Sequence, residues 1–207
     1  MPVEKIVVES DRAWAIWRIA EDETTLQREL DGLENMPEGL NNSQKRLEWL
    51  AGRVATKLVM AALNVDFHGI TKDEFGKPFL RRSALHLSLS HSFPYAAALA
   101  NKTSSVGIDL EQPKEKLFRI AERIHRPEEL SDLKNDLVKH CIYWCAKESM
   151  IKLHGRKDLI FAENIFIQPF QRKEEGNITG KLIIGDNESI IRMHYVVYPS
   201  FVMVYTC

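Results

Sequence analysis

Two carboxylates stand close together in the short segment VGIDLE, residues 106–111. The segment alternates apolar and polar residues and predicts a strand, on which Asp109 and Glu111 share one face about 7 Å apart. Carboxylates that close repel each other unless a cation lies between them, and hard divalent cations such as Mg²⁺ prefer oxygen ligands. Glu148, beside the expected buried side of a later helix, would supply a third carboxylate. The three acids predict a magnesium site, with ordinary solvated acids as the alternative.

Groups that suit an anion stand near these acids and elsewhere in the chain. Lys152 follows Glu148 by four residues, a spacing that is also typical of a stabilising surface pair on a helix, worth about 0.2–0.5 kcal/mol. Ser90 and His91 end a predicted strand just before the Phe93-Pro94 turn, where hydroxyls and backbone N–H groups can meet an anion. A structural role is the alternative for this histidine.

A basic stripe is predicted on a helix over residues 43–63. At about 100° per residue, Arg46, Arg53 and Lys57 fall within roughly 40° of one another, beside the apolar face. Guanidinium and ammonium groups both bind phosphate oxygens, so Arg53 together with Lys77 could hold a phosphate monoester. A solvated basic face is the alternative.

Hydrophobic periodicity and turn residues place these side chains on strands and helices. Strands with their hairpin connections are predicted within residues 13–21, 73–80, 84–92, 95–102, 104–112 and 180–207. Long helices are predicted over residues 43–63 and 136–155. The residues expected to face the core are Leu47, Leu50, Ala51, Val54, Leu58 and Ala61 on the first helix, and Val106, Ile108 and Leu110 on the strand at 104–112. These elements predict an α+β fold.

The two halves of the chain show a faint internal duplication. The segment WLAGRVATK, residues 49–57, matches WCAKESMIK, residues 144–152, so that a basic residue of the first corresponds to an acid of the second. The match predicts two similar lobes, residues 1–103 and 104–207, related by a pseudo-twofold axis. Cations of the first lobe and acids of the second would then meet in the cleft between them. Chance similarity of two helix-and-hairpin units is the alternative.

The composition excludes several classes of protein. Twenty-eight Lys and Arg nearly balance 29 Asp and Glu, and the formal net charge of -1 predicts no nucleic-acid or membrane partner. The first residues lack the features of a signal peptide, and no apolar run is long enough to span a bilayer, so we expect a cytoplasmic protein. Three cysteines are too few for a disulfide framework. A monomer is expected because two lobes already supply a paired surface.

Five motifs occur in order between Gly52 and Lys152: GRVATK, FGKP, LSLSHS, VGIDLE and WCAKESMIK. Together they resemble the 4'-phosphopantetheinyl transferases of the larger, surfactin-synthetase-activating type, which are two similar α+β lobes in a single chain. VGIDLE and WCAKES, with a lysine four residues after the glutamate, form a specific pair, whereas GKP or SHS alone is weak. The resemblance implies an enzyme that uses Mg²⁺ to transfer the 4'-phosphopantetheine group from coenzyme A to a serine of an apo acyl or peptidyl carrier protein, releasing adenosine 3',5'-bisphosphate.

The resemblance also implies a role for each matching residue. The implied groups are Asp109, Glu111 and Glu148 for Mg²⁺ on the pyrophosphate; Lys152 and His91 for the pyrophosphate itself; and Arg46, Arg53 and Lys77 for the nucleotide end with its 3'-phosphate. Ser90 is a further candidate for binding coenzyme A. Either Glu148 or a metal-bound water would take the proton of the serine. The charged segment 113–136 would help to dock the acidic carrier, with Arg119, Arg123 and Arg126 as candidate contacts. A solvated amphipathic helix is the alternative for that segment.

Two rival functions are weighed against this one. A non-catalytic homologue that only binds coenzyme A or a carrier protein would not need the intact acids together with Lys152. A Mg²⁺-dependent nuclease also pairs acids with a lysine, but its usual arrangement separates the first acid from an acid-x-lysine strand. The near-zero net charge also counts against a nuclease.

Overall fold

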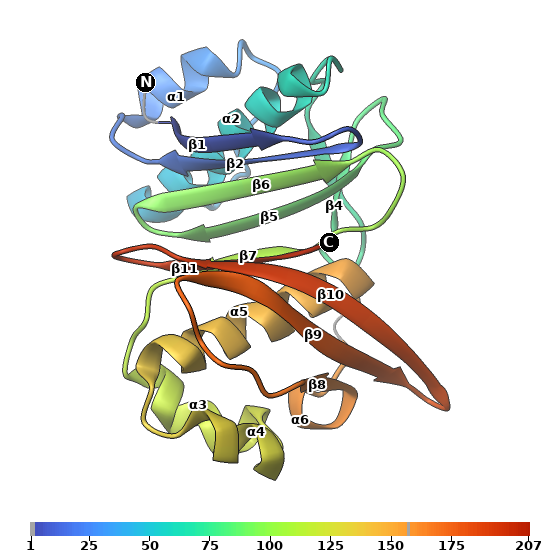
Figure 1. Ribbon diagram of the computed structural model, residues 1–207. Coiled ribbons are helices and arrows are strands. Elements are labelled where there is room, and N and C mark those ends of the chain that lie inside the picture. The colour runs from blue at the N-terminus through green and yellow to red at the C-terminus, as the bar shows by residue number, and fades with distance from the viewer. Residues whose placement is uncertain (1–2, 157) are drawn as a thin grey trace. The chain divides into compact units, whose positions relative to one another are not determined.

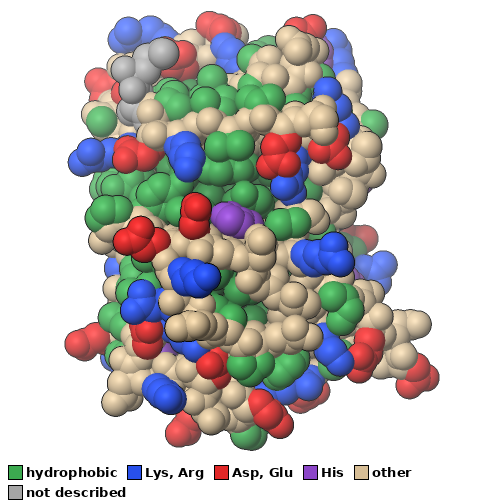
Figure 2. All heavy atoms as spheres, in the orientation of Figure 1, with side chains coloured by type: hydrophobic (Ala, Val, Ile, Leu, Met, Phe, Trp, Pro, Cys, Tyr) green, Lys and Arg blue, Asp and Glu red, His purple; other side chains and the backbone are tan. Residues whose placement is uncertain are grey.

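The computed structural model describes residues 3–156 and 158–207, and the chain divides into two compact units, Met1–Val106 and Gly107–Cys207. Each unit holds one antiparallel sheet with one long helix packed on it (Figure 1). The α+β class predicted from the sequence is therefore confirmed. Figure 2 shows basic and acidic side chains interspersed over the visible face of the units. No helix in the described ranges combines the length and the apolar character that crossing a membrane requires.

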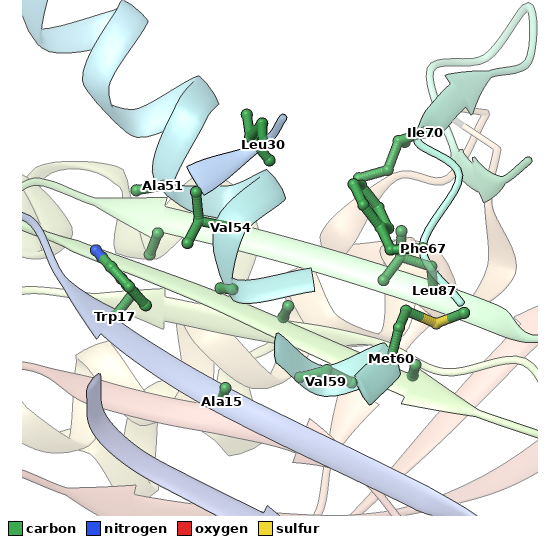
Figure 3. Close-up of a cluster of buried hydrophobic side chains, with 14 of the residues drawn as sticks. Ala15, Trp17, Leu30, Ala51, Val54, Val59, Met60, Phe67, Ile70 and Leu87 are labelled. Carbon is green, nitrogen blue, oxygen red and sulfur yellow. The ribbon is translucent and has the colours of Figure 1, made fainter. Parts of the chain in front are cut away.

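The first unit is built on a six-stranded sheet. Its elements are β1 (Val3–Val8), β2 (Arg12–Arg18), α1 (Glu23–Glu29), α2 (Ser43–Ala62), β3 (Ile70–Lys72), β4 (Pro78–Leu80), β5 (His86–Ser92) and β6 (Tyr95–Asn101). The strands lie in the order β1-β2-β6-β5-β4-β3, and α2 packs on β2, β6 and β5. Figure 3 shows the core between helix and sheet, where Val54 and Met60 of α2 meet Trp17 of β2 and Leu87 of β5.

The helix α2 begins where the sequence predicts it, because the Asn42 side chain accepts the backbone N–H of Lys45 at 3.0 Å and caps the first turn. Its buried face differs from the predicted stripe. Ala55 and Val59 are fully buried, whereas Ala61 is exposed. The difference arises because α1 packs on a second side of α2, so that more than one stripe of the helix is covered.

The second unit is built on a five-stranded sheet. Its elements are β7 (Ile108–Glu111), α3 (Lys116–Ile124), α4 (Pro127–Leu133), α5 (Leu137–His154), α6 (Phe161–Asn164), β8 (Ile165–Ile167), β9 (Glu175–Ile184), β10 (Asn187–Val197) and β11 (Val202–Thr206). The order is β7-β11-β10-β9-β8, and α5 packs across all five strands. The Asp136 side chain caps the start of α5, and Gly155, with φ of 84°, ends it in the left-handed region, as the sequence predicts.

The two units share one chain topology. Apart from β1, which has no counterpart among the described strands of the second unit, each unit has one strand before its long helix and four strands after it. The last of these four lies beside the strand that precedes the helix: β6 beside β2 in one unit, β11 beside β7 in the other. The matched segments 49–57 and 144–152 lie on the corresponding helices α2 and α5. This correspondence supports an internal duplication, while the pseudo-twofold axis and the cleft stay predictions.

The approach of β7 to α5 depends on the absence of a side chain at Gly107. A Cβ at this position would lie 1.8 Å from the backbone oxygen of Ser149 on α5. Gly107 also pairs with Thr206 at the end of β11, donating its N–H to Oγ1 at 3.0 Å and accepting the Thr206 N–H at 2.9 Å. The backbone at this position therefore has little room to move aside.

We expect Gly107→Ala to lower the free energy of unfolding by roughly 3 kcal/mol, because the methyl group forces strand and helix apart. Urea denaturation measures this loss. Gly52→Ala on α2 is the matched control, since a Cβ there has no neighbour within 4 Å, and it should cost nothing. Equal stability of the two variants would contradict the close approach of β7 to α5.

Candidate active site

The first part of the site lies in the second unit, where β7 runs against α5. Asp109 is only 5% exposed, and its Oδ1 accepts a hydrogen bond from Lys152 Nζ at 2.7 Å. Lys152 Nζ also donates to the backbone oxygen of Ile108 at 3.0 Å. The Asp109 side chain is thus directed to the helix. The predicted burial of Val106, Ile108 and Leu110 is confirmed, and Asp109 is buried as well because it pairs with Lys152 of the helix.

Glu148 stands one helical turn before Lys152 and is half-buried. Burial raises the pKa of Glu148 to about 7, the negative charges of Asp109 and Glu111 add to the rise, and the charge of Lys152 opposes it. The predicted acids and the predicted lysine therefore interact electrostatically in one place. Lys152 of α5 contacts Asp109 and acts on Glu148, whereas Glu111 lies 3.7 Å from Lys116 of α3.

The donor set suits a hard cation in chemistry, because all three ligands that the sequence predicts are carboxylates. A cation would also favour the ionised form of Glu148. However, no group of three or more His, Cys, Asp or Glu side chains in the described ranges is arranged so that it could hold a metal ion. Lys152 Nζ forms an ion pair with Asp109 Oδ1 at 2.7 Å, and Lys116 Nζ lies 3.7 Å from Glu111 Oε1. The magnesium site stays a prediction, and it requires these side chains to rearrange.

Lys147, inside the WCAKES motif, belongs to the interior of the second unit. Its ammonium group is fully buried and contacts Glu129 Oε2 at 2.7 Å. It also donates to the backbone oxygens of Ile124 and Ile165, each at 2.8 Å. This lysine ties α3, α4 and β8 to α5 and takes no part in the acid cluster.

The candidate contacts for a carrier protein separate into two kinds. Arg126 donates to the backbone oxygen of Ala162 at 2.8 Å and lies over the Phe166 ring, so it holds α6 and β8. A docking role for Arg126 is therefore not supported. Arg119 and Arg123 are exposed on α3 and keep their candidacy.

Two cations of the basic stripe on α2, Arg46 and Lys57, are paired with acids of the same unit. Arg46 pairs with Glu23 at 2.8 Å, and Lys57 pairs with Asp31 at 2.6 Å. Both acids come from the segment around α1, which the helical periodicity of α2 cannot reveal. The Arg46–Glu23 pair is part-exposed, so an incoming phosphate can compete with the glutamate for the guanidinium.

Arg53 is the most enclosed of these cations. Its guanidinium lies 3.4 Å from the centroid of the Trp49 ring, and Nε stands 3.4 Å from Glu34 Oε2. Burial lowers the pKa of Arg53 to about 10, with the charge of Glu34 opposing the fall. Glu34 also receives the Ile70 N–H, so Arg53 helps to fasten a loop to α2 and β3. Its contact with a nucleotide stays a prediction.

Lys77 and Ser90 lie in the sheet region of the first unit. Lys77 Nζ donates to Ser105 Oγ at 2.9 Å, and burial lowers the pKa of Lys77 while the charge of Asp73 opposes the shift. Asp73 also accepts the Lys77 backbone N–H at 2.8 Å, which shapes the turn before β4. Ser90 is buried on β5, one residue before His91.

His91 has a partner that the sequence analysis missed. Its Nδ1 stands 3.2 Å from Oε2 of Glu48, a glutamate of α2 whose side chain is 3% exposed. Glu48 shares the buried face of the helix with Ala51 and Ala55. An acid on the buried face of a helix needs a hydrogen-bonding or charged partner, and this feature of the sequence could have indicated the contact.

Comparison with known proteins connects these residues to a family. Residues 105–201 match the family model of the 4'-phosphopantetheinyl transferase superfamily. A protein of Bacillus subtilis named 4'-phosphopantetheinyl transferase is 28% identical over 129 residues, which cover 58% of this chain and 55% of that protein. The chain thus spans about half the length of this relative. The family match contains β7 and α5, and both similarities support a transferase.

Proposed function

We propose that this chain is a 4'-phosphopantetheinyl transferase, which moves the phosphopantetheine arm of coenzyme A to a serine of an apo acyl or peptidyl carrier protein. The observation that carries the proposal is the cluster of Asp109, Glu111, Glu148 and Lys152, with the pKa of Glu148 raised to about 7. The family match includes all four residues. A group transfer between phosphates depends mainly on positioning and on neutralising charge on phosphate oxygens.

In this proposal the residues of the second unit have different roles at the pyrophosphate. Lys152 neutralises a phosphate oxygen, and Asp109 holds the lysine in place through their 2.7 Å contact. The serine oxygen bonds to the phosphorus of the pantetheine arm, the bond from that phosphorus to the bridging oxygen breaks, and adenosine 3',5'-bisphosphate leaves. Glu148 is the chain's own candidate for taking the serine proton, and the ionised form that accepts a proton is the one that a bound cation would favour. Mg²⁺, held by Asp109, Glu111 and Glu148, would supply further charge neutralisation.

The residues of the first unit act on the same coenzyme A molecule in this proposal. His91 and Ser90 would contact the pyrophosphate, and Lys77 and Arg46 would bind the nucleotide end with its 3'-phosphate. Arg53 stays a candidate, although its contacts with Trp49 and Glu34 also support a structural role.

A transfer assay tests the proposal against its rivals. The purified chain is incubated with coenzyme A, Mg²⁺ and several apo carrier proteins, and the intact mass of each carrier is measured. The expected result is a phosphopantetheine adduct that requires both coenzyme A and Mg²⁺. Binding of coenzyme A without an adduct on any carrier would favour the non-catalytic homologue. Cleavage of DNA that depends on Asp109 would favour the nuclease.

Replacement of Lys77 tests the nucleotide contact. We expect Lys77→Ala to raise the KM for coenzyme A by about tenfold or more while leaving kcat nearly unchanged, because a charged hydrogen bond to a phosphate contributes roughly 1.5–3 kcal/mol. Initial rates over a range of coenzyme A concentrations measure both constants. A loss confined to kcat would contradict a role at the nucleotide.

A further inference from the structure

Glu48 is a buried acid with four nitrogen-bearing neighbours, two from its own helix α2 and two from the end of β5 and the residue that follows it. Its Oε1 accepts the backbone N–H of Phe93 at 3.2 Å and the side chain of Gln44 at 3.3 Å. Its Oε2 accepts Lys45 Nζ at 2.7 Å and stands 3.2 Å from His91 Nδ1. One oxygen is therefore held by neutral donors, and the other faces two groups that can carry positive charge.

The carboxylate is ionised in this setting. Burial alone raises the pKa of Glu48, but the hydrogen bond from Lys45, the charge of His91 and the hydrogen bond from Gln44 outweigh it and lower the pKa below its ordinary value. The Glu48 side chain is 3% exposed and that of His91 is 47% exposed, so the contact is shielded from water and salt on the side of the carboxylate. Glu48 thus presents a fixed negative charge to one nitrogen of His91.

A carboxylate at 3.2 Å decides which nitrogen of a histidine carries the proton, because the proton stays on the nitrogen that can donate to it. For His91 that nitrogen is Nδ1, whereas Nε2 is the ring nitrogen that does not face Glu48. The same contact stabilises the doubly protonated ring, in which Nε2 also becomes a donor. The Phe93 N–H on Oε1 holds the carboxylate at the end of β5, two residues beyond the histidine.

We propose that Glu48 is the positioning residue for His91. It orients the ring and keeps the proton of the neutral ring on Nδ1. It also stabilises the charged form of the ring, whose second proton, on Nε2, is directed to an anionic oxygen. This proposal rests on the proposed function, in which the anionic oxygen belongs to a phosphate of coenzyme A. Glu48 itself contacts no substrate in this account.

Glu48→Gln is the sharpest variant because it keeps the shape of the side chain. Its carbonyl oxygen is expected to retain the Phe93 N–H, since a backbone donor cannot turn away from an opposing amide. The amide NH₂ then faces His91 Nδ1, which must accept, and the proton moves to Nε2. Lys45, which is 53% exposed, can turn to solvent.

Long-range ¹⁵N–¹H spectra of the neutral imidazole, assigned by comparison with His91→Ala, test this directly without any substrate. We expect the Nδ1–H tautomer in the unaltered chain and the Nε2–H tautomer in Glu48→Gln. Glu9→Gln, which removes an exposed acid from its pair with Arg12, is the matched control and should leave the His91 spectrum unchanged. The Nε2–H tautomer in the unaltered chain would overturn the proposal even if the Glu48 variant failed to fold.

The transfer assay adds a functional readout. Glu48→Gln is expected to raise the KM for coenzyme A about tenfold, and to have little further effect when His91→Ala is already present. Equal effects of Glu48→Gln with and without His91 would overturn the positioning role. If the unaltered chain forms no adduct with any carrier, the proposed function fails, while the spectra still decide whether Glu48 positions His91.

Discussion

Asp109→Asn lowers the rate of phosphopantetheine transfer by at least about 10²-fold, in line with the loss of one preorganised charged group from a phosphoryl-transfer site. The variant keeps the size of the side chain and one oxygen near Lys152, so the free energy of unfolding should change by about 1 kcal/mol or less. The large effect is expected because Asp109 both orients Lys152 and carries one of the three carboxylates proposed to hold Mg²⁺. Single-turnover rates and urea denaturation of the same preparation separate the two effects.

Asp158→Asn provides the matched control for this change. Asp158 is an exposed acid of the same unit that pairs with His154 at 3.3 Å, outside the acid cluster, and its replacement should leave the transfer rate unchanged. An Asp109→Asn variant with a rate within about threefold of the unaltered chain would exclude the cluster as the active site.

Lys147→Met lowers the free energy of unfolding by roughly 3–5 kcal/mol, because it leaves the charge of Glu129 buried without its cation. Lys147 and Glu129 are both fully buried and lie 2.7 Å apart. Methionine has a similar length and no charge, so lost packing adds little. Urea denaturation followed by circular dichroism measures the loss.

Two further variants show whether charge is the cause. Adding Glu129→Gln to Lys147→Met removes the unpaired charge and keeps an oxygen for the Ile167 N–H, which Glu129 accepts at 2.8 Å; this variant should recover part of the stability. Lys181→Met removes a lysine whose side chain is 36% exposed and should cost little. A Lys147→Met variant as stable as Lys181→Met would contradict the buried ion pair.

The sequence predicts the long helices well because their signals are local. Asn42 and Asp136 cap α2 and α5 at the starts of the predicted helices, and Gly155 ends α5. The hairpin of β5 and β6 was also predicted, from the alternation on both sides of Phe93-Pro94. The strand β1 and the helix α1 were not predicted. The segment around α1 supplies the acids that pair with the cations of α2, which is why the state of those cations was missed.

The acid cluster was predictable in part. Periodicity placed Asp109 and Glu111 on one face of a strand, and their electrostatic effect on Glu148 agrees with that placement. Periodicity could not show that Lys152 reaches Asp109, because the two lie 43 positions apart. Glu48 was missed for the same reason: the contact that reveals its role joins α2 to Phe93, 45 positions away. Such pairings depend on tertiary packing, which no local pattern records.

The most direct test of the proposed transferase locates the modified atom on the carrier. An apo carrier protein is incubated with this chain, coenzyme A and Mg²⁺, digested, and its peptides are sequenced by mass spectrometry, beside a carrier whose acceptor serine is replaced by alanine. The predicted result is phosphopantetheine on that serine, formed by the unaltered chain and absent with Asp109→Asn. An unmodified serine on every carrier tried, or equal modification by Asp109→Asn, would contradict the account.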